Sequence, residues 1–168
     1  MKLYFSGFSL DNEENLFDEY REKSDFIVAG FSYGAIKALE YVLNTDNRVD
    51  KLQLFSPAYF NDKDKKYKRM QLIYFKKDAE LYCSNFLKNA SFTSEHIKKY
   101  FKMGTYEELE ELLSYEWSHK KMDILKEKNI TLEIYLGDED KIINAQNALE
   151  FFRDFGEVYY IKNKGHIL

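Results

Sequence analysis

Short apolar runs alternate with longer amphipathic stretches along the 168 residues of this chain. The apolar runs have the length of buried strands, and they lie at about 2–5, 26–29, 51–55, 131–136 and 157–161. The amphipathic stretches repeat apolar residues at helical spacing, and they lie at about 11–22, 34–44 and 144–154. Strands that alternate with helices predict one mostly parallel sheet of about five strands, flanked by helices.

A chain of 168 residues can bury a single core of this kind. If neighbours in the sequence are also neighbours in the sheet, right-handed crossovers place the connecting helices on one face. The opposite face then needs another cover, and a homodimer is one arrangement that would supply it.

About seventy residues between Ser56-Pro57 and the strand at 131 have helical character. The pattern predicts short helices at 65–77, 79–88 and 94–102. The sequence Thr105-Tyr106-Glu107-Glu108 is a capping box that opens a fourth helix. We therefore expect a core made of 1–59 and 119–168, with a helical cap, 60–118, inserted above it. The aromatic residues of the cap either line a channel for an acyl chain or form the core of the cap itself.

The pentapeptide Gly30-Phe31-Ser32-Tyr33-Gly34 lies where the strand at 26–29 should pass into the helix at 34–44. A serine in such a turn is held above the sheet edge, and glycines flank it because side chains there would collide with neighbouring backbone. The pattern is typical of the nucleophile elbow of α/β-hydrolases. A glycine-lined turn that only packs closely on a helix is the alternative interpretation.

An acid and a histidine follow the serine in the chain order typical of α/β-hydrolases. The strand at 131–136 runs into Gly137-Asp138-Glu139-Asp140, and the strand at 157–161 is followed by Gly165-His166. We choose Asp140 over Asp138, because Asp138 would leave the strand too early to reach the imidazole. The two other histidines lie in polar helical stretches and are expected to face solvent: His96 and His119.

These residues can be given roles in an acyl-transfer reaction. His166 would take the proton of Ser32 as the serine attacks a carbonyl, and Asp140 would fix the imidazole tautomer. The oxyanion needs two preorganised donors, for which we expect the backbone amides of Tyr33 and Phe8. Phe8 lies in the loop after the first strand, where many hydrolases have histidine-glycine and this chain has serine-glycine.

The composition argues against several classes of protein. A single cysteine, Cys83, excludes an internal disulfide and suggests a reducing compartment. We see no signal peptide and no run of membrane-spanning length, so we expect a cytoplasmic protein without membrane contact. Cysteines and histidines are too few for a structural zinc site, and we find no glycine-rich phosphate loop, so we expect neither metal nor cofactor.

Charge is distributed unevenly along the chain. Residues 60–104 carry eleven Lys and Arg against five Asp and Glu, so this segment is +6, while the whole chain is −4 and the remainder is −10. A basic cap on an acidic body suggests an anionic partner that docks over the active site. The docking candidates are Lys63, Lys65, Lys66, Lys68, Arg69, Lys76 and Lys77.

An acidic carrier protein with a thioester-linked acyl chain fits both this charge and the expected chemistry. Nucleic acid fits less well, because no recognised binding module is present. The alternative interpretation is that the basic residues form a solvated helix face.

The chain resembles the short-form pimeloyl-[acyl-carrier-protein] methyl ester esterases of biotin synthesis. The resemblance is carried by residues 5–8, 30–41, 54–57, 68–72, 107–113, 137–140, 149–152 and 165–166. It implies hydrolysis of the methyl ester of a carrier-bound C7 diacid, which gives pimeloyl-carrier protein and methanol. It assigns catalysis to Ser32, Asp140 and His166, and carrier docking to the basic cap.

Two other functions stay open at this point. The chain could be another acyl hydrolase, such as a thioesterase, because one triad serves both ester and thioester cleavage. It could also be a carrier-binding protein without catalytic activity.

Overall fold

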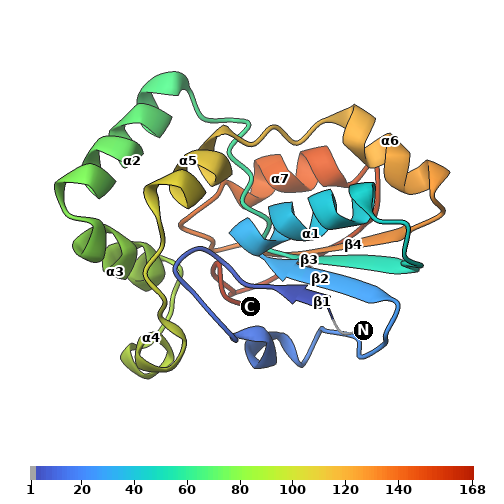
Figure 1. The fold of residues 1–168 in the computed structure, drawn as a ribbon, viewed down its shortest axis with the longest axis horizontal. Helices are drawn as coiled ribbons and strands as arrows, with labels where there is room; N and C mark the ends of the chain where they lie inside the picture. The colour runs from blue at the N-terminus through green and yellow to red at the C-terminus, as the bar shows by residue number, and fades with distance from the viewer. Residues whose placement is uncertain (1–2) are drawn as a thin grey trace.

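The computed structural model describes residues 3–168, and this part of the chain contains one five-stranded sheet (Figure 1). The strands are β1 (Leu3–Phe5), β2 (Ile27–Phe31), β3 (Lys51–Phe55), β4 (Thr131–Gly137) and β5 (Glu157–Ile161). They lie in chain order, and every neighbouring pair is parallel. The expected reduced sheet of five parallel strands is therefore confirmed.

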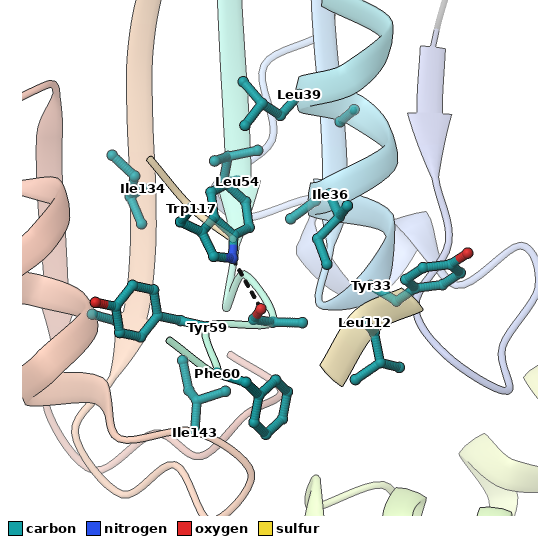
Figure 2. Packing of buried hydrophobic residues seen from close by; sticks show 14 of the residues in the cluster. Tyr33, Ile36, Leu39, Leu54, Tyr59, Phe60, Leu112, Trp117, Ile134 and Ile143 are labelled. Carbon is teal, nitrogen blue, oxygen red and sulfur yellow. Dashed lines mark hydrogen bonds between the residues drawn. The ribbon is translucent and has the colours of Figure 1, made fainter. Parts of the chain in front are cut away.

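Three helices cover one face of the sheet, as expected from right-handed crossovers (Figure 1). They are α1 (Tyr33–Asn44), α6 (His119–Glu127) and α7 (Ala145–Phe152). Their apolar sides pack on alternate residues of the central strands, which are aliphatic on this face: Val28, Leu52, Leu54, Leu132 and Ile134. Figure 2 shows Trp117 inside this layer, beside Leu54 and Ile134, with Ile36 and Leu39 of α1 close by. The first face thus has a continuous apolar core.

The segment between β1 and β2 differs from the expectation of a helix at 11–22. It contains a single 3-10 turn, η1 (Glu14–Phe17), and Asn12 has a left-handed backbone with φ of 60°. The ring of Phe17 is fully buried under the sheet, with its centroid 4.8 Å from those of both Phe31 and Phe55. The long helix is absent because tertiary packing outweighs a weak local preference in a segment rich in Asp and Asn.

The second face of the sheet is covered by segments of the chain itself. Its strand residues are aromatic near the carboxyl ends of the strands, where Phe31, Phe55 and Tyr135 form a second cluster. The cover comes from η1, from α3 and α4 of the cap with the link between them, and from the last residues of the chain: Phe17, Leu87, Phe92, Tyr100, Ile167 and Leu168. A homodimer at this face stays a prediction.

The cap contains the four expected helices, α2 (Lys65–Lys77), α3 (Ala79–Asn89), α4 (Ser94–Tyr100) and α5 (Tyr106–Ser114). The capping box is complete: the amide of Glu108 donates to the hydroxyl of Thr105 at 3.1 Å, and the amide of Thr105 donates to the carboxylate of Glu108 at 3.0 Å. In Figure 1, α2, α3 and α5 lie beyond the carboxyl ends of the strands, where β2 passes into α1. No helix in residues 3–168 is both long and apolar enough to cross a membrane.

Backbone hydrogen bonds tie the end of α3 and the end of α4 to loops at the carboxyl end of the sheet. The amide of Ile167 donates to the carbonyl of Ala90, and the amide of Asp11 donates to the carbonyl of Tyr100. The division at 59/60 and 118/119 remains a prediction. The helical cap is nevertheless bonded directly to the segments that carry the candidate site.

Candidate active site

Ser32 lies at a sharp turn between β2 and α1. Its backbone has φ of 54° and ψ of −114°, a conformation that a residue with a side chain adopts only when its surroundings impose it. The flanking glycines are required by close backbone contacts. A Cβ on Gly30 would lie 2.2 Å from the carbonyl oxygen of Gly34, and one on Gly34 would lie 1.9 Å from that of Phe5. The turn has the geometry expected of a nucleophile elbow.

The structure brings together Ser32, His166 and Asp140, the three residues that the sequence suggested for catalysis. The Nε2 of His166 lies 2.8 Å from the Oγ of Ser32, and its Nδ1 lies 2.6 Å from the Oδ2 of Asp140. The histidine is fully buried and Ser32 is 1% exposed. The three groups form a continuous hydrogen-bonded chain that is shielded from solvent.

The two aspartates after β4 have different environments. Asp140 accepts the amides of Ile142 and Ile143 on its other oxygen, at 2.7 and 3.0 Å, so both of its carboxylate oxygens are held. Asp138 instead accepts the amide of Asn163, at 2.7 Å, and so supports the loop that leads to the histidine. The geometry therefore favours Asp140 as the partner of the imidazole.

Ser56 supports the histidine in a way that the sequence analysis did not identify. Its hydroxyl donates to the backbone carbonyl of His166 at 2.6 Å, and its own backbone has φ of 40°. The ring of Phe31 lies against the imidazole, with centroids 5.1 Å apart. The only available signal in the sequence was the position of Ser56-Pro57 directly after a strand.

Trp117 is a second residue that the sequence analysis missed. Its indole Nε1 donates to the carbonyl of Ala58 at 3.0 Å (Figure 2), and the amide of Ala58 donates to the carbonyl of Ser32 at 3.1 Å. The buried indole therefore helps to hold the loop after β3 against the elbow.

The two expected oxyanion donors lie on adjoining segments. Tyr33 is the first residue of α1, and amides in the first turn of a helix have no partner within the helix. Phe8 is buried in the loop after β1. Within residues 3–168, neither amide donates a hydrogen bond to another protein group. Both amides therefore have no protein acceptor in this part of the chain, as the expected role requires.

The side chain of Tyr33 links the elbow to the cap. Its hydroxyl donates to the Oε2 of Glu111 on α5 at 2.6 Å. Burial, and then the neighbouring carboxylate, raise the pKa of this phenol well above its ordinary value. The phenol therefore stays protonated and keeps its role as a donor to α5.

A cavity of about 560 Å³ lies under α2, α3 and α5. Its wall combines apolar and aromatic residues, which include Phe60, Tyr74, Tyr82, Phe86, Leu109 and Ile142. Its polar lining residues are Gln71, Lys77, Asp78, Asn85, Asn89 and Lys141. Phe75, Phe92 and Tyr100 are buried in the protein core instead. Some aromatic residues of the cap therefore line a cavity, whereas others belong to the core.

This cavity adjoins the candidate catalytic groups, but neither Ser32 nor His166 is part of its wall. Ile142, which lines it, donates its amide to Asp140, and Phe86, which also lines it, packs edge-on against Phe8 at 5.3 Å. A ligand in the cavity would therefore lie next to the loop that carries Asp140 and the loop that carries Phe8.

The basic residues selected for docking lie mainly on the solvent side of α2. Lys65, Lys66, Arg69, Lys76 and Lys77 are exposed, whereas Lys63 and Lys68 are half-buried. Lys63 lies 3.9 Å from Asp62, and Lys76 lies over the ring of Tyr106. Three apolar side chains are exposed near them: Ile73, Tyr74 and Leu81. The surface combines exposed cations with apolar groups.

The two remaining histidines do not contribute to this site. His119 is exposed, as expected. His96 is half-buried and packs near Phe92 and Tyr100, because α4 turns this side toward the second face of the sheet. Within residues 3–168, no group of three or more His, Cys, Asp or Glu side chains could hold a metal ion.

No family model and no curated protein matches the sequence. Solved structures do match the fold. E-2-(acetamidomethylene)succinate hydrolase aligns with a TM-score of 0.63 and 10% identity, over 99% of this chain and 84% of that one. BioG from Haemophilus influenzae aligns with a TM-score of 0.60 and 16% identity, over 99% of this chain and 88% of that one. MenH from S. aureus aligns with a TM-score of 0.60 and 14% identity, over 98% of this chain and 85% of that one. At these identities the likeness establishes the fold, which is that of the α/β-hydrolases.

Proposed function

We propose that this protein is a serine hydrolase that cleaves carboxylic esters. The observation that carries the proposal is the hydrogen-bonded chain from Ser32 through His166 to Asp140, built on a strained elbow. Serine is a weak nucleophile at its own pKa and needs an adjacent base, which the imidazole supplies at 2.8 Å. Asp140 holds the Nδ1–H tautomer and stabilises the imidazolium that forms.

The reaction proceeds in two balanced halves. Ser32 Oγ bonds to the ester carbonyl carbon while His166 takes its proton, and the oxyanion receives hydrogen bonds from the amides of Tyr33 and Phe8. The intermediate then breaks its bond to the alcohol, which leaves with the proton from His166. Water, deprotonated by the same imidazole, attacks the acyl-serine and releases the acid and the free serine.

The substrate class that we propose is the methyl ester of pimeloyl-carrier protein, with pimeloyl-carrier protein and methanol as products. Three observations support it. The sequence resembles the short esterases of biotin synthesis, a cavity partly lined by aromatic and aliphatic side chains adjoins the catalytic loops, and α2 exposes cations suited to an acidic carrier. No cofactor is needed for this chemistry.

The test is incubation with methyl-pimeloyl carrier protein, followed by mass analysis of the carrier-bound acyl group. An esterase lowers the mass by one CH2 unit and leaves the chain on the carrier, whereas a thioesterase releases the whole acyl chain.

A fluorophosphonate should label the wild type at Ser32 and leave Ser32→Ala unlabelled. Ser32→Ala should also retain less than about 1% of the hydrolytic activity with an unchanged melting temperature, because losing the nucleophile disables the whole triad. A wild type that binds the carrier but takes no label would be a carrier-binding protein.

A further inference from the structure

We infer that Glu13 is a positioning residue for the oxyanion hole: it binds the N–H of the Ser6–Gly7 peptide and so holds Gly7, the residue before Phe8. The inference rests on the proposed hydrolase function, but it is carried by contacts that involve none of the three triad residues. Glu13 precedes η1, and its side chain is fully buried. It belongs to the segment in which the expected long helix is absent.

The carboxylate of Glu13 is held between the first strand and the loop that follows it. Its Oε1 accepts the amide of Gly7 at 2.8 Å and the hydroxyl of Tyr4 at 3.0 Å. Within residues 3–168, no Lys, Arg or His forms an ion pair with it. Burial raises its pKa, although the bond from Gly7 opposes that shift.

Burying a carboxylate without a cationic partner costs stability, and an apolar side chain of similar size would avoid the cost. Residues that break the rules of stability in this way cluster at functional sites. The group that Glu13 binds is consistent with such a role, because Gly7 is next to the expected oxyanion donor.

The hydrogen bonds around Gly7 determine where the amide of Phe8 points. Glu13 holds the N–H of Gly7, and the amide of Leu10 donates to the carbonyl of Gly7 at 3.2 Å. That carbonyl and the N–H of Phe8 belong to one planar trans peptide, so they point in opposite directions. Fixing the carbonyl on Leu10 therefore turns the Phe8 N–H away from the loop and leaves it free.

The loop lies directly against the elbow. A Cβ on Gly7 would lie 2.7 Å from the ring of Phe31, the residue before Ser32. A Cβ on Gly34 would lie 2.6 Å from the carbonyl oxygen of Ser6. Displacement of this loop would move the Phe8 amide relative to Ser32 while leaving the triad in place.

The test uses Glu13→Met, a replacement of similar size that cannot accept a hydrogen bond. We expect kcat on a small soluble ester to fall about 10- to 100-fold with KM nearly unchanged, because an oxyanion donor acts on the transition state. Fluorophosphonate labelling of Ser32 should slow in parallel. The melting temperature should stay close to that of the wild type, because removal of a buried carboxyl group that forms no ion pair within residues 3–168 offsets the lost hydrogen bonds.

Two further variants complete the test. Glu13→Gln keeps an oxygen that can accept both bonds and should restore most of kcat. Glu19→Gln, the same change at an exposed position of the same segment, should behave as wild type. Unchanged kcat in Glu13→Met would overturn the inference, as would a Glu13→Met protein that is unfolded at the assay temperature. A wild type that neither hydrolyses the ester nor takes the label would instead refute the proposed function.

Discussion

The two faces of the sheet are built in different ways. The first face is covered by regular helices over aliphatic residues such as Leu52, Leu54 and Ile134. The second face is covered by a 3-10 turn, by α3 and α4 of the cap and by the chain terminus, over aromatic rings and the buried polar groups of Gln53 and Glu133. On the first face, many similar helix–sheet contacts stabilise the fold, and none of them is decisive. The irregular cover of the second face depends on individual contacts.

Several of those individual contacts reach the candidate site. Phe31 packs on the imidazole of His166, Ile167 bonds to Ala90 of the cap, and Glu13 holds Gly7. Many contacts that position the candidate site therefore come from the irregular cover of the second face. We expect substitutions there to affect activity more than equivalent substitutions on the regular side.

The largest expected effect concerns the two aspartates after β4. Asp140→Asn should lower kcat about 10⁴-fold, because an amide favours the wrong imidazole tautomer. Asp138→Asn should cost much less, because Asp138 only accepts the amide of Asn163 and an amide oxygen can replace that bond. Steady-state rates on a small ester provide the measurement, and the reverse order would show that the acid is Asp138.

The solvent side of the cap offers a second contrast. Charge reversal of Lys66, Lys68 and Arg69 to glutamate should raise KM for a carrier-bound ester about tenfold or more and leave a small ester unaffected, because rim charges govern encounter. Added salt should raise KM for the wild type on the carrier substrate alone. The matched control reverses Lys98, Lys99 and Lys102, which are exposed at or just after α4.

Equal losses on both substrates would mean that the basic residues of α2 support the fold of the cap. No loss on either substrate would mean that they form an ordinary solvated face.

A matched pair of phenylalanines compares the two faces directly. Phe17 under the second face and Phe152 under the first are both fully buried. Changing either to leucine should cost about 1 kcal/mol of unfolding free energy, seen as similar drops in melting temperature. Only Phe17→Leu should also lower kcat, by a few-fold, because Phe17 contacts the residues that precede Ser32 and Ser56. Equal kcat in both variants would contradict the assignment of the site to the irregular side.

The smallest effect is a dependence of stability on pH. Burial alone would raise the pKa of Glu133, but hydrogen bonds from Lys51, Gln53 and Tyr135 outweigh it and hold the pKa below its ordinary value of 4.5. A carboxylate with a lowered pKa in the folded state stabilises the fold above pH 4.5, and this stability is lost as pH falls through the folded-state pKa. Urea unfolding between pH 3 and 6 should therefore show a weaker pH dependence for Glu133→Gln than for the wild type.

Local patterns in the sequence were enough for the regular parts of the molecule. The strand periods, the elbow glycines and the capping box of Thr105 each depend on neighbours within a few residues, so the five-stranded sheet and the four helices of the cap could be predicted. The three candidate catalytic residues could be selected because α/β-hydrolases have such residues in a fixed chain order, and the structure places them within hydrogen-bonding distance.

Only the tertiary structure decided how the second face is covered and what holds the site. The segment at 11–22 forms no long helix, because burial of Phe17 outweighs its weak helical preference. Ser56, Trp117 and Glu13 contact groups 110, 59 and 6 residues away in the chain. The helix and strand patterns in the sequence do not indicate such contacts, because these contacts form only when the sheet and the cap pack around the elbow.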